Sequence, residues 1–378
     1  MKRRVDGYCL EVCEKFKGAK NVMGDRMHKE RNSVFEFVRL LAMFMIVFEH
    51  AMLATSLHTE NVLSAIDNIS WFLEAFTICA VNLFFLLTGY FATDNRIDLK
   101  RIGKIWGKTI FYSTMIYLIA LVCGQDSFSV KTFVSFLCPV TFKQYWFMQV
   151  YIVLSLISPF VIRMLNTLTK VEHLWLIGVL ALFFSLHQTF IPIKYTLDQT
   201  QGYGIIWATV MLIIGNYFKK YENEIFSRTR ASILLLGYSI IAITVFVSNY
   251  LIVKFDIAQG VTSRGNFYAY NSVTIFWESL FLFGFFVKLS YRGWTNKVVN
   301  WFAGSALAVY LISSHPELLY PLWTDIFKLR IEDTNIVLFI TNAVIESMIT
   351  LVLCILIDKF VDRLIGKLKS IFLMIRRA

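Results

Sequence analysis

The sequence predicts an all-α polytopic membrane protein of about ten transmembrane helices, with both termini in the cytoplasm. Apolar residues make up 57% of the 378-residue chain and charged residues only 17%, a balance unlike that of soluble domains. Ten apolar segments are long enough to cross about 30 Å of hydrocarbon. Lysine and arginine alternate between the connecting segments as the positive-inside rule requires.

The ten predicted spans follow one another without a long soluble insert, a linker or an internal repeat. They cover residues 34–55, 71–93, 105–123, 145–165, 174–191, 204–218, 232–253, 272–289, 298–316 and 335–358. We therefore expect a basic cytoplasmic N-terminal arm over residues 1–33, one membrane domain over 34–358 and a basic cytoplasmic tail over 359–378.

The charge distribution orients the spans. With the N-terminus inside, 29 of the 37 lysines and arginines fall in or beside cytoplasmic segments, seven lie in outer loops, and Arg39 lies within the first span. The formal net charge of +11 then reflects cytoplasmic anchoring rather than nucleic acid binding. The predicted location is the cell (plasma) membrane, with several passes.

Two ionisable residues share one stripe of the first predicted span. Arg39 and His50 are eleven positions apart, so they differ in direction by about 20° and in height by roughly 16 Å. Glu36 falls about 40° from the same stripe. Because ionisable side chains inside a span are costly, they mark a functional site by default. Arg39 lies near the cytoplasmic end and His50 in the outer half.

Each of these residues has a functional and a structural interpretation. His50 suits a general base acting on a hydroxyl, or a buried histidine that only joins two helices. Arg39 suits a phosphate or pyrophosphate ligand, or an ion pair with Glu36. The 16 Å separation is comparable to the reach of a pantetheine arm from its phosphates to its thioester, which favours the functional interpretation.

Further polar residues extend this candidate site. The second span opens into a basic cytoplasmic run that includes Arg96, Lys100 and Arg101, which suits either anionic lipid or the phosphates of a nucleotide donor. On the outer side, the predicted topology allows a cluster of five residues from three spans, and their proximity is a hypothesis: His50, Trp146, Gln149, Tyr151 and His315.

The cysteines give little indication of a metal site or a disulfide. Cys9 and Cys13 lack a second pair or a histidine cluster, so we expect no metal site. Cys123 and Cys138 flank one predicted outer loop, where a disulfide is one of two alternatives.

Several motifs resemble the membrane acyltransferase 3 family of integral-membrane O-acyltransferases. They are the first span from Arg31 to His50 with its Arg-x10-His spacing, Val81-Asn82 through Thr88-Gly89-Tyr90-Phe91, Tyr145-Trp146 through Pro159-Phe160, Gly215-Asn216-Tyr217-Phe218, Tyr270-Asn271-Ser272 and Val309-Tyr310 through His315. Relatives often carry two histidines where this chain has Glu49-His50.

The resemblance implies O-acyl transfer, usually O-acetyl transfer, from cytoplasmic acyl-CoA to a hydroxyl of an extracytoplasmic or lipid-linked polysaccharide. His50 is then the base or a transient acyl carrier, Arg39 and Glu36 complete the catalytic group, and Arg96, Lys100 and Arg101 bind the donor. Seven residues are expected to line the site or hold the acceptor: Asn82, Thr88, Trp146, Gln149, Tyr151, Tyr310 and His315.

The expected partners are an acyl-CoA co-substrate, a surface glycan or lipid-linked sugar, and membrane lipids, with no permanently bound cofactor. The main alternative is a polytopic exporter of a glycan or small solute, and a third is a receptor or assembly scaffold. The absence of two halves with matching interrupted helices speaks against a transporter. The acyl group, the acceptor sugar and the oligomeric state are not encoded in recognisable motifs.

Overall fold

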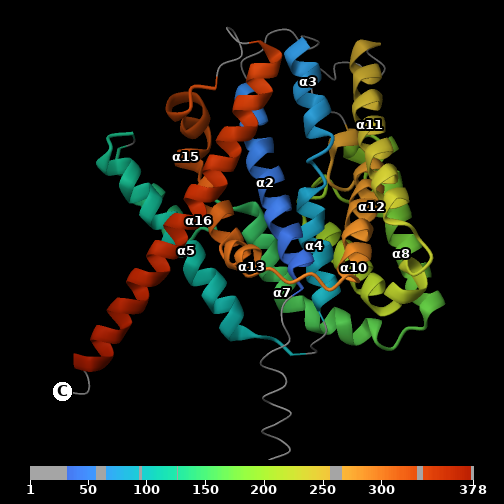
Figure 1. Cartoon of the computed structure of the whole chain (residues 1–378), viewed down its shortest axis with the longest axis horizontal. Helices are drawn as coiled ribbons and strands as arrows, with labels where there is room; N and C mark the ends of the chain where they lie inside the picture. The colour runs from blue at the N-terminus through green and yellow to red at the C-terminus, as the bar shows by residue number, and fades with distance from the viewer. Residues whose placement is uncertain are drawn as a thin grey trace, which may run out of the picture.

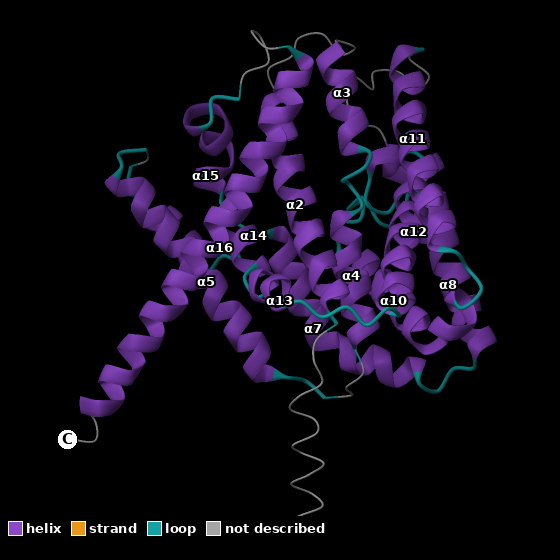
Figure 2. Ribbon diagram, in the orientation of Figure 1, coloured by secondary structure: helices purple, strands orange, loops and turns teal. Residues whose placement is uncertain are grey.

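The computed structural model describes residues 32–56, 65–92, 96–125, 127–255, 266–329 and 335–375. These residues form helices and connecting loops, and Figure 2 shows no strand among them. The predicted all-α polytopic fold is therefore confirmed. Most of the predicted N-terminal arm, with Cys9 and Cys13, lies outside the described residues.

Each predicted span coincides with helical structure. In chain order the helices are α2 (Ser33–Ser56), α3 (Ala65–Glu74), α4 (Ala80–Phe91), α5 (Leu99–Val122), α6 (Val130–Leu137), α7 (Trp146–Leu165), α8 (Lys170–Ala181), the π-helical η1 (Leu182–Leu186), α9 (His187–Phe190), the 3-10 helical η2 (Ile193–Tyr195), α10 (Ile205–Phe226), α11 (Ala231–Lys254), the 3-10 helical η3 (Asn266–Tyr268), α12 (Val273–Ser290), α13 (Lys297–Ala303), α14 (Ala306–Ser313), α15 (Pro316–Pro321), the π-helical η4 (Leu322–Ile326) and α16 (Ile336–Ile375).

Seven helical stretches of the described chain are long and apolar enough to cross a membrane. The sixth predicted span is the long helix α10, whose last third carries Lys219, Lys220 and Glu222. The second and ninth predicted spans hold shorter apolar helices instead. In both, the helix is interrupted within the span.

The second span breaks at residues 75–79, between α3 and α4, where the sequence has neither glycine nor proline. A tertiary partner supports the break, since the Tyr238 hydroxyl of α11 donates to the carbonyl oxygen of Phe76 at 2.6 Å. The ninth span breaks at Gly304 and Ser305, between α13 and α14. Two of the predicted spans are therefore interrupted helices, which the sequence pattern did not indicate.

Helix α2 is the centre of the bundle. It packs against α4, α12, α13, α14 and α16, and Figure 1 shows it in the middle of the molecule. Its side chains enter two separate hydrophobic clusters: Val38 and Ala42 belong to one, Val47 and Phe48 to the other. The stripe that carries Arg39 and His50 therefore lies where several helices meet.

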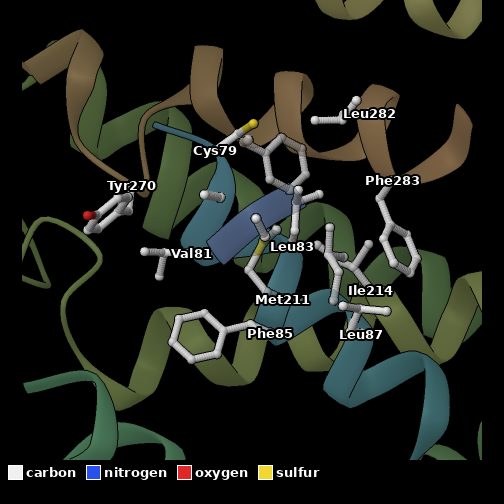
Figure 3. Close-up of a cluster of buried hydrophobic side chains, with 14 of the residues drawn as sticks. Cys79, Val81, Leu83, Phe85, Leu87, Met211, Ile214, Tyr270, Leu282 and Phe283 are labelled. Atoms are coloured by element: carbon white, nitrogen blue, oxygen red, sulfur yellow. The ribbon is translucent and has the colours of Figure 1, made fainter. Parts of the chain in front are cut away.

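Helices α4 and α10 cross at very short range. A Cβ atom on Gly89 would overlap the carbonyl oxygen of Leu212, and one on Gly215 would overlap that of Leu86. The reciprocal contact lets the backbones touch, which is the usual role of small residues between membrane helices. Figure 3 shows the apolar cluster around this crossing, with Leu83 and Leu87 of α4 beside Ile214 of α10.

A buried ion pair ties α16 to α5. Lys108 Nζ lies 2.6 Å from Oδ1 of the fully buried Asp358, and the Tyr112 hydroxyl donates to the same oxygen at 2.7 Å. Beyond this point the chain stays helical to Ile375. Residues 359–375 of the predicted basic tail are thus a continuation of the last membrane helix.

Candidate functional site

A pocket of about 440 Å³ opens among α2, α4, α7, the start of α5 and the break between α13 and α14. Its volume lies within the range of about 300–1,000 Å³ for small-molecule sites. The polar lining residues are Arg39, Thr88, Arg96, Asp98, Arg101, Tyr151, Ser155, Ser158 and Tyr310. Three arginines, predicted from two separate segments of the sequence, therefore meet around one cavity.

The Arg39 guanidinium keeps N–H groups for a ligand although it forms an ion pair. Its Nη1 atom lies 2.6 Å from Oε1 of Glu36, one helical turn earlier. The guanidinium also lies 5.5 Å from the ring centre of Phe91. Because a guanidinium carries five N–H donors and the Arg39 side chain is 30% exposed, the pair with Glu36 orients this group without consuming it.

Helix α5 brings a second guanidinium to the pocket. Its first residues are fixed because the Asp98 side chain accepts a hydrogen bond from the backbone N–H of Arg101 at 3.0 Å. Arg101 Nη2 donates to the Tyr151 hydroxyl at 3.2 Å. Arg96 lines the pocket from the segment before α5, whereas Lys100 does not line it. The predicted donor-binding run thus divides into two residues at the site and one outside it.

Helix α7 presents a hydroxyl stripe that the sequence interpretation missed. Ser155 and Ser158 line the pocket together with Tyr151. Their spacing of four and three residues places all three within about 60° on one helix face. The two serine hydroxyls donate to backbone carbonyls of their own helix. A polar repeat at positions i, i+4 and i+7 on an apolar span is the signal that could have identified them.

Apolar side chains also line the pocket. They include Met43, Phe84 and Phe147, and the rings of Phe147 and Tyr310 lie 5.5 Å apart, edge to face. Met43 lies on the Arg39 stripe of α2, seven residues or about 10 Å before His50. Arg39 and Met43 therefore line the pocket from the same stripe that continues to the histidine.

His50 lies beyond the lining of the pocket, next to α14. Its Nδ1 atom is 3.5 Å from the Ser314 hydroxyl, at the end of that helix. Ser314 follows Tyr310 by one helical turn, or about 6 Å of rise. Tyr310, which lines the pocket, is thus one helical turn from the residue at the end of α14 that contacts His50.

The predicted outer cluster is not assembled as expected. Trp146 and Gln149 do not line the pocket, because they project from α7 more than 100° away from Tyr151. The Trp146 ring instead stacks on Tyr270, with ring centres 5.8 Å apart. Tyr151 points toward Arg101 rather than toward an outer group.

Two other predicted site residues have partners inside the helix bundle. The Asn82 amide donates to the Tyr270 carbonyl and the Ser279 hydroxyl and accepts from the Trp207 indole, all within 3.0 Å. The hydrogen bonds of the Asn82 amide therefore join α4 to α10 and α12. Thr88 lines the pocket, but its hydroxyl also donates to the Phe84 carbonyl of its own helix at 2.8 Å.

His315 is also held by the protein itself. Its Nε2 atom lies 3.0 Å from the Ser113 carbonyl of α5, and its Nδ1 atom accepts the backbone N–H of Glu317 as the N-cap of α15. The ring stacks on Phe136, with centres 4.9 Å apart. These contacts fit a neutral imidazole that anchors α5, α6 and α15. Cys123 and Cys138, the two cysteines of the predicted outer loop, are both free.

A comparison with known protein families matches residues 32–359 to an acyltransferase domain. The chain belongs to the acyltransferase 3 family. The match spans every predicted span and includes Arg39, His50 and the pocket. Comparisons with curated proteins and with solved structures each find no significant match. The chain is thus a multi-pass membrane protein with an acyltransferase domain, and its arginine-lined pocket is the candidate site for that chemistry.

Proposed function

We propose that this protein transfers an acyl group, in the first instance acetyl, from cytoplasmic acyl-CoA to a hydroxyl of an extracytoplasmic or lipid-linked polysaccharide. The observation that carries the proposal is the pocket that Arg39, Arg96 and Arg101 line together with the apolar side chains of Met43, Phe84 and Phe147. A phosphate-rich head group with a long, mostly uncharged arm that ends in a thioester matches this combination of arginines and apolar side chains, and His50 lies further along the Arg39 stripe of α2.

The three arginines of the pocket suit the phosphates of the acyl-CoA donor. Guanidinium groups form bidentate, charge-assisted hydrogen bonds with phosphate oxygens. The first residues of α14 also line the pocket, and a helix N-terminus carries partial positive charge. The pantetheine arm would then lie between Phe84, Phe147 and Met43, with its thioester near Tyr310.

In this proposal His50 carries out the chemical step by either of two mechanisms. As a base, the neutral imidazole takes the proton of the acceptor hydroxyl while that oxygen attacks the thioester carbon, the C–S bond breaks and the CoA thiolate leaves. As a nucleophile, an imidazole nitrogen first attacks the thioester carbon, the C–S bond breaks and the CoA thiolate leaves. The acceptor hydroxyl then attacks the acyl-imidazole, the C–N bond breaks, and the released imidazole takes the hydroxyl proton. In both mechanisms the thioester must reach His50 past the side chains of Phe147 and Tyr310.

The transporter alternative has one observation in its favour, the interrupted second and ninth spans. Interrupted helices form many transporter binding sites. Here, however, the ninth-span break opens onto the arginine-lined pocket, with Gly304 in its lining, so it also fits a donor site. The family match favours the acyltransferase.

The test uses the purified full-length protein in liposomes with radiolabelled acetyl-CoA. The proposal expects saturable binding of the label, and slow hydrolysis or transfer to an added lipid-linked sugar, all reduced by Arg101→Gln. An exporter or scaffold would bind no acetyl-CoA, and that result would refute the proposal.

A further inference from the structure

Helix α16 is longer than a membrane span requires. Its 40 residues extend about 60 Å, twice the hydrocarbon thickness of about 30 Å. Fully buried side chains along it end at Asp358, and the acyltransferase domain ends at residue 359. Figure 1 shows the remaining turns projecting from the bundle at its lower left. They therefore need an environment that the rest of the described chain does not supply.

These turns are strictly amphipathic. With Phe360 set to 0°, the apolar residues of 360–371 lie within an arc of about 140°, and the polar residues fill the remaining directions. The apolar residues are Phe360, Val361, Leu364, Ile365, Leu368 and Ile371. Phe360 is 67% exposed and Leu368 is 57% exposed. An apolar helix face of this width is not expected to remain in water.

The opposite face is basic. Arg363, Lys367 and Lys369 outnumber the single acidic residue, Asp362, so residues 360–371 carry a net charge of +2. In Figure 1 this segment lies at the same side of the bundle as the start of α5, where Arg96 and Arg101 approach the pocket. That side is the cytoplasmic side by the predicted orientation.

We propose that residues 360–371 bind the surface of the cytoplasmic leaflet, with the apolar arc in the acyl boundary and the basic face on anionic lipid headgroups. A basic face opposite a wide apolar face is the pattern of interfacial helices, and cytoplasmic leaflets carry negative charge. The predicted tenth span ends at residue 358, so the segment begins where that span leaves the hydrocarbon. A second copy of the chain could also bury the apolar arc, but it would bring two positively charged segments together. The repulsion between them favours the lipid surface as the partner.

The experiment uses nitroxide labels on the full-length protein in liposomes. Cys9, Cys13, Cys123 and Cys138 are replaced by serine, and the label is attached at Leu364→Cys on the apolar arc. A second protein carries it at Ser370→Cys, the matched control on the polar face. Collision rates with oxygen, which concentrates in lipid, and with a water-soluble nickel chelate report the depth of each label.

In phosphatidylcholine mixed with phosphatidylglycerol, the Leu364 label should favour oxygen several-fold more than the Ser370 label. Because each basic residue near an anionic surface contributes about fivefold to association, neutralising Arg363, Lys367 and Lys369 to glutamine should weaken binding roughly a hundredfold and return the Leu364 label to water. Equal exposure of both labels in anionic liposomes would overturn the proposal. So would an unchanged label depth after neutralisation, or spin–spin coupling between copies at Leu364, which would identify a second chain as the partner.

Discussion

Replacing Arg101 by glutamine removes one of the guanidinium groups that line the pocket and leaves the adjacent Lys100 in place. The two residues belong to the same basic run at the start of α5, and each carries one positive charge. Only Arg101 lines the pocket, where it donates to the Tyr151 hydroxyl. Comparing the Arg101→Gln and Lys100→Gln variants therefore separates a specific contact with acyl-CoA from general electrostatic attraction by a basic surface.

The expected effects differ in size. A hydrogen bond from a charged donor contributes about 1.5–3 kcal/mol, so losing one to a donor phosphate should weaken acyl-CoA binding by roughly 10- to 150-fold. Lys100 and Arg101 are both exposed, but Lys100 does not line the pocket, and an exposed charge without a direct contact to the ligand contributes about 1 kcal/mol or less. Lys100→Gln should therefore change the binding constant by about fivefold at most, and moderate salt should remove this effect because exposed charges are screened over about 8–10 Å.

The assay is equilibrium binding of radiolabelled acetyl-CoA to the purified protein in liposomes at two salt concentrations. Turnover is measured in the same preparations, because KM equals Kd only when chemistry is slow. Equal losses for Arg101→Gln and Lys100→Gln, both abolished by salt, would refute the assignment of the pocket as the donor site. They would leave the basic run as a membrane anchor.

Three further predictions concern the same molecule. His50→Gln should reduce turnover by about 10²–10⁴ without weakening acetyl-CoA binding, whereas near-normal turnover would exclude His50 as base or carrier. Arg39→Lys should weaken donor binding, because a point charge does not reproduce a planar fork; rescue of Arg39→Gln by Glu36→Gln would instead identify a purely structural ion pair. Gly89→Ala should destabilise the fold by about 1–3 kcal/mol, since its Cβ would overlap the Leu212 carbonyl. Gly103→Ala on α5, with open space around it, should be neutral or slightly stabilising, and equal thermal shifts for both glycine variants would contradict the close α4–α10 crossing.

The parts of the site that lie on one helix could be predicted from the sequence. Arg39 and Met43 both line the pocket from the predicted stripe, and His50 continues that stripe. Helical periodicity alone fixes these relations. Applied to α7, the same periodicity would have separated Tyr151, Ser155 and Ser158 from Trp146 and Gln149.

Relations between helices could not be predicted in this way. An asparagine in an apolar span indicates function, yet the partners of Asn82 come from α10 and α12 and are invisible in its local sequence. The break at residues 75–79 carries no glycine or proline, and its Phe76 carbonyl is bound by Tyr238 from α11. Such features depend on packing between segments that are distant in the sequence.

The central claim is that the donor enters from the cytoplasm while the acceptor is used on the other side. It is tested most directly by supplying radiolabelled acetyl-CoA to one face of sealed vesicles that contain the lipid-linked acceptor. Inside-out vesicles should acylate the acceptor, sealed right-side-out vesicles should not, and His50→Gln should be inactive in both. Equal acylation from both faces of sealed vesicles would contradict the account, because donor and acceptor would then share one compartment.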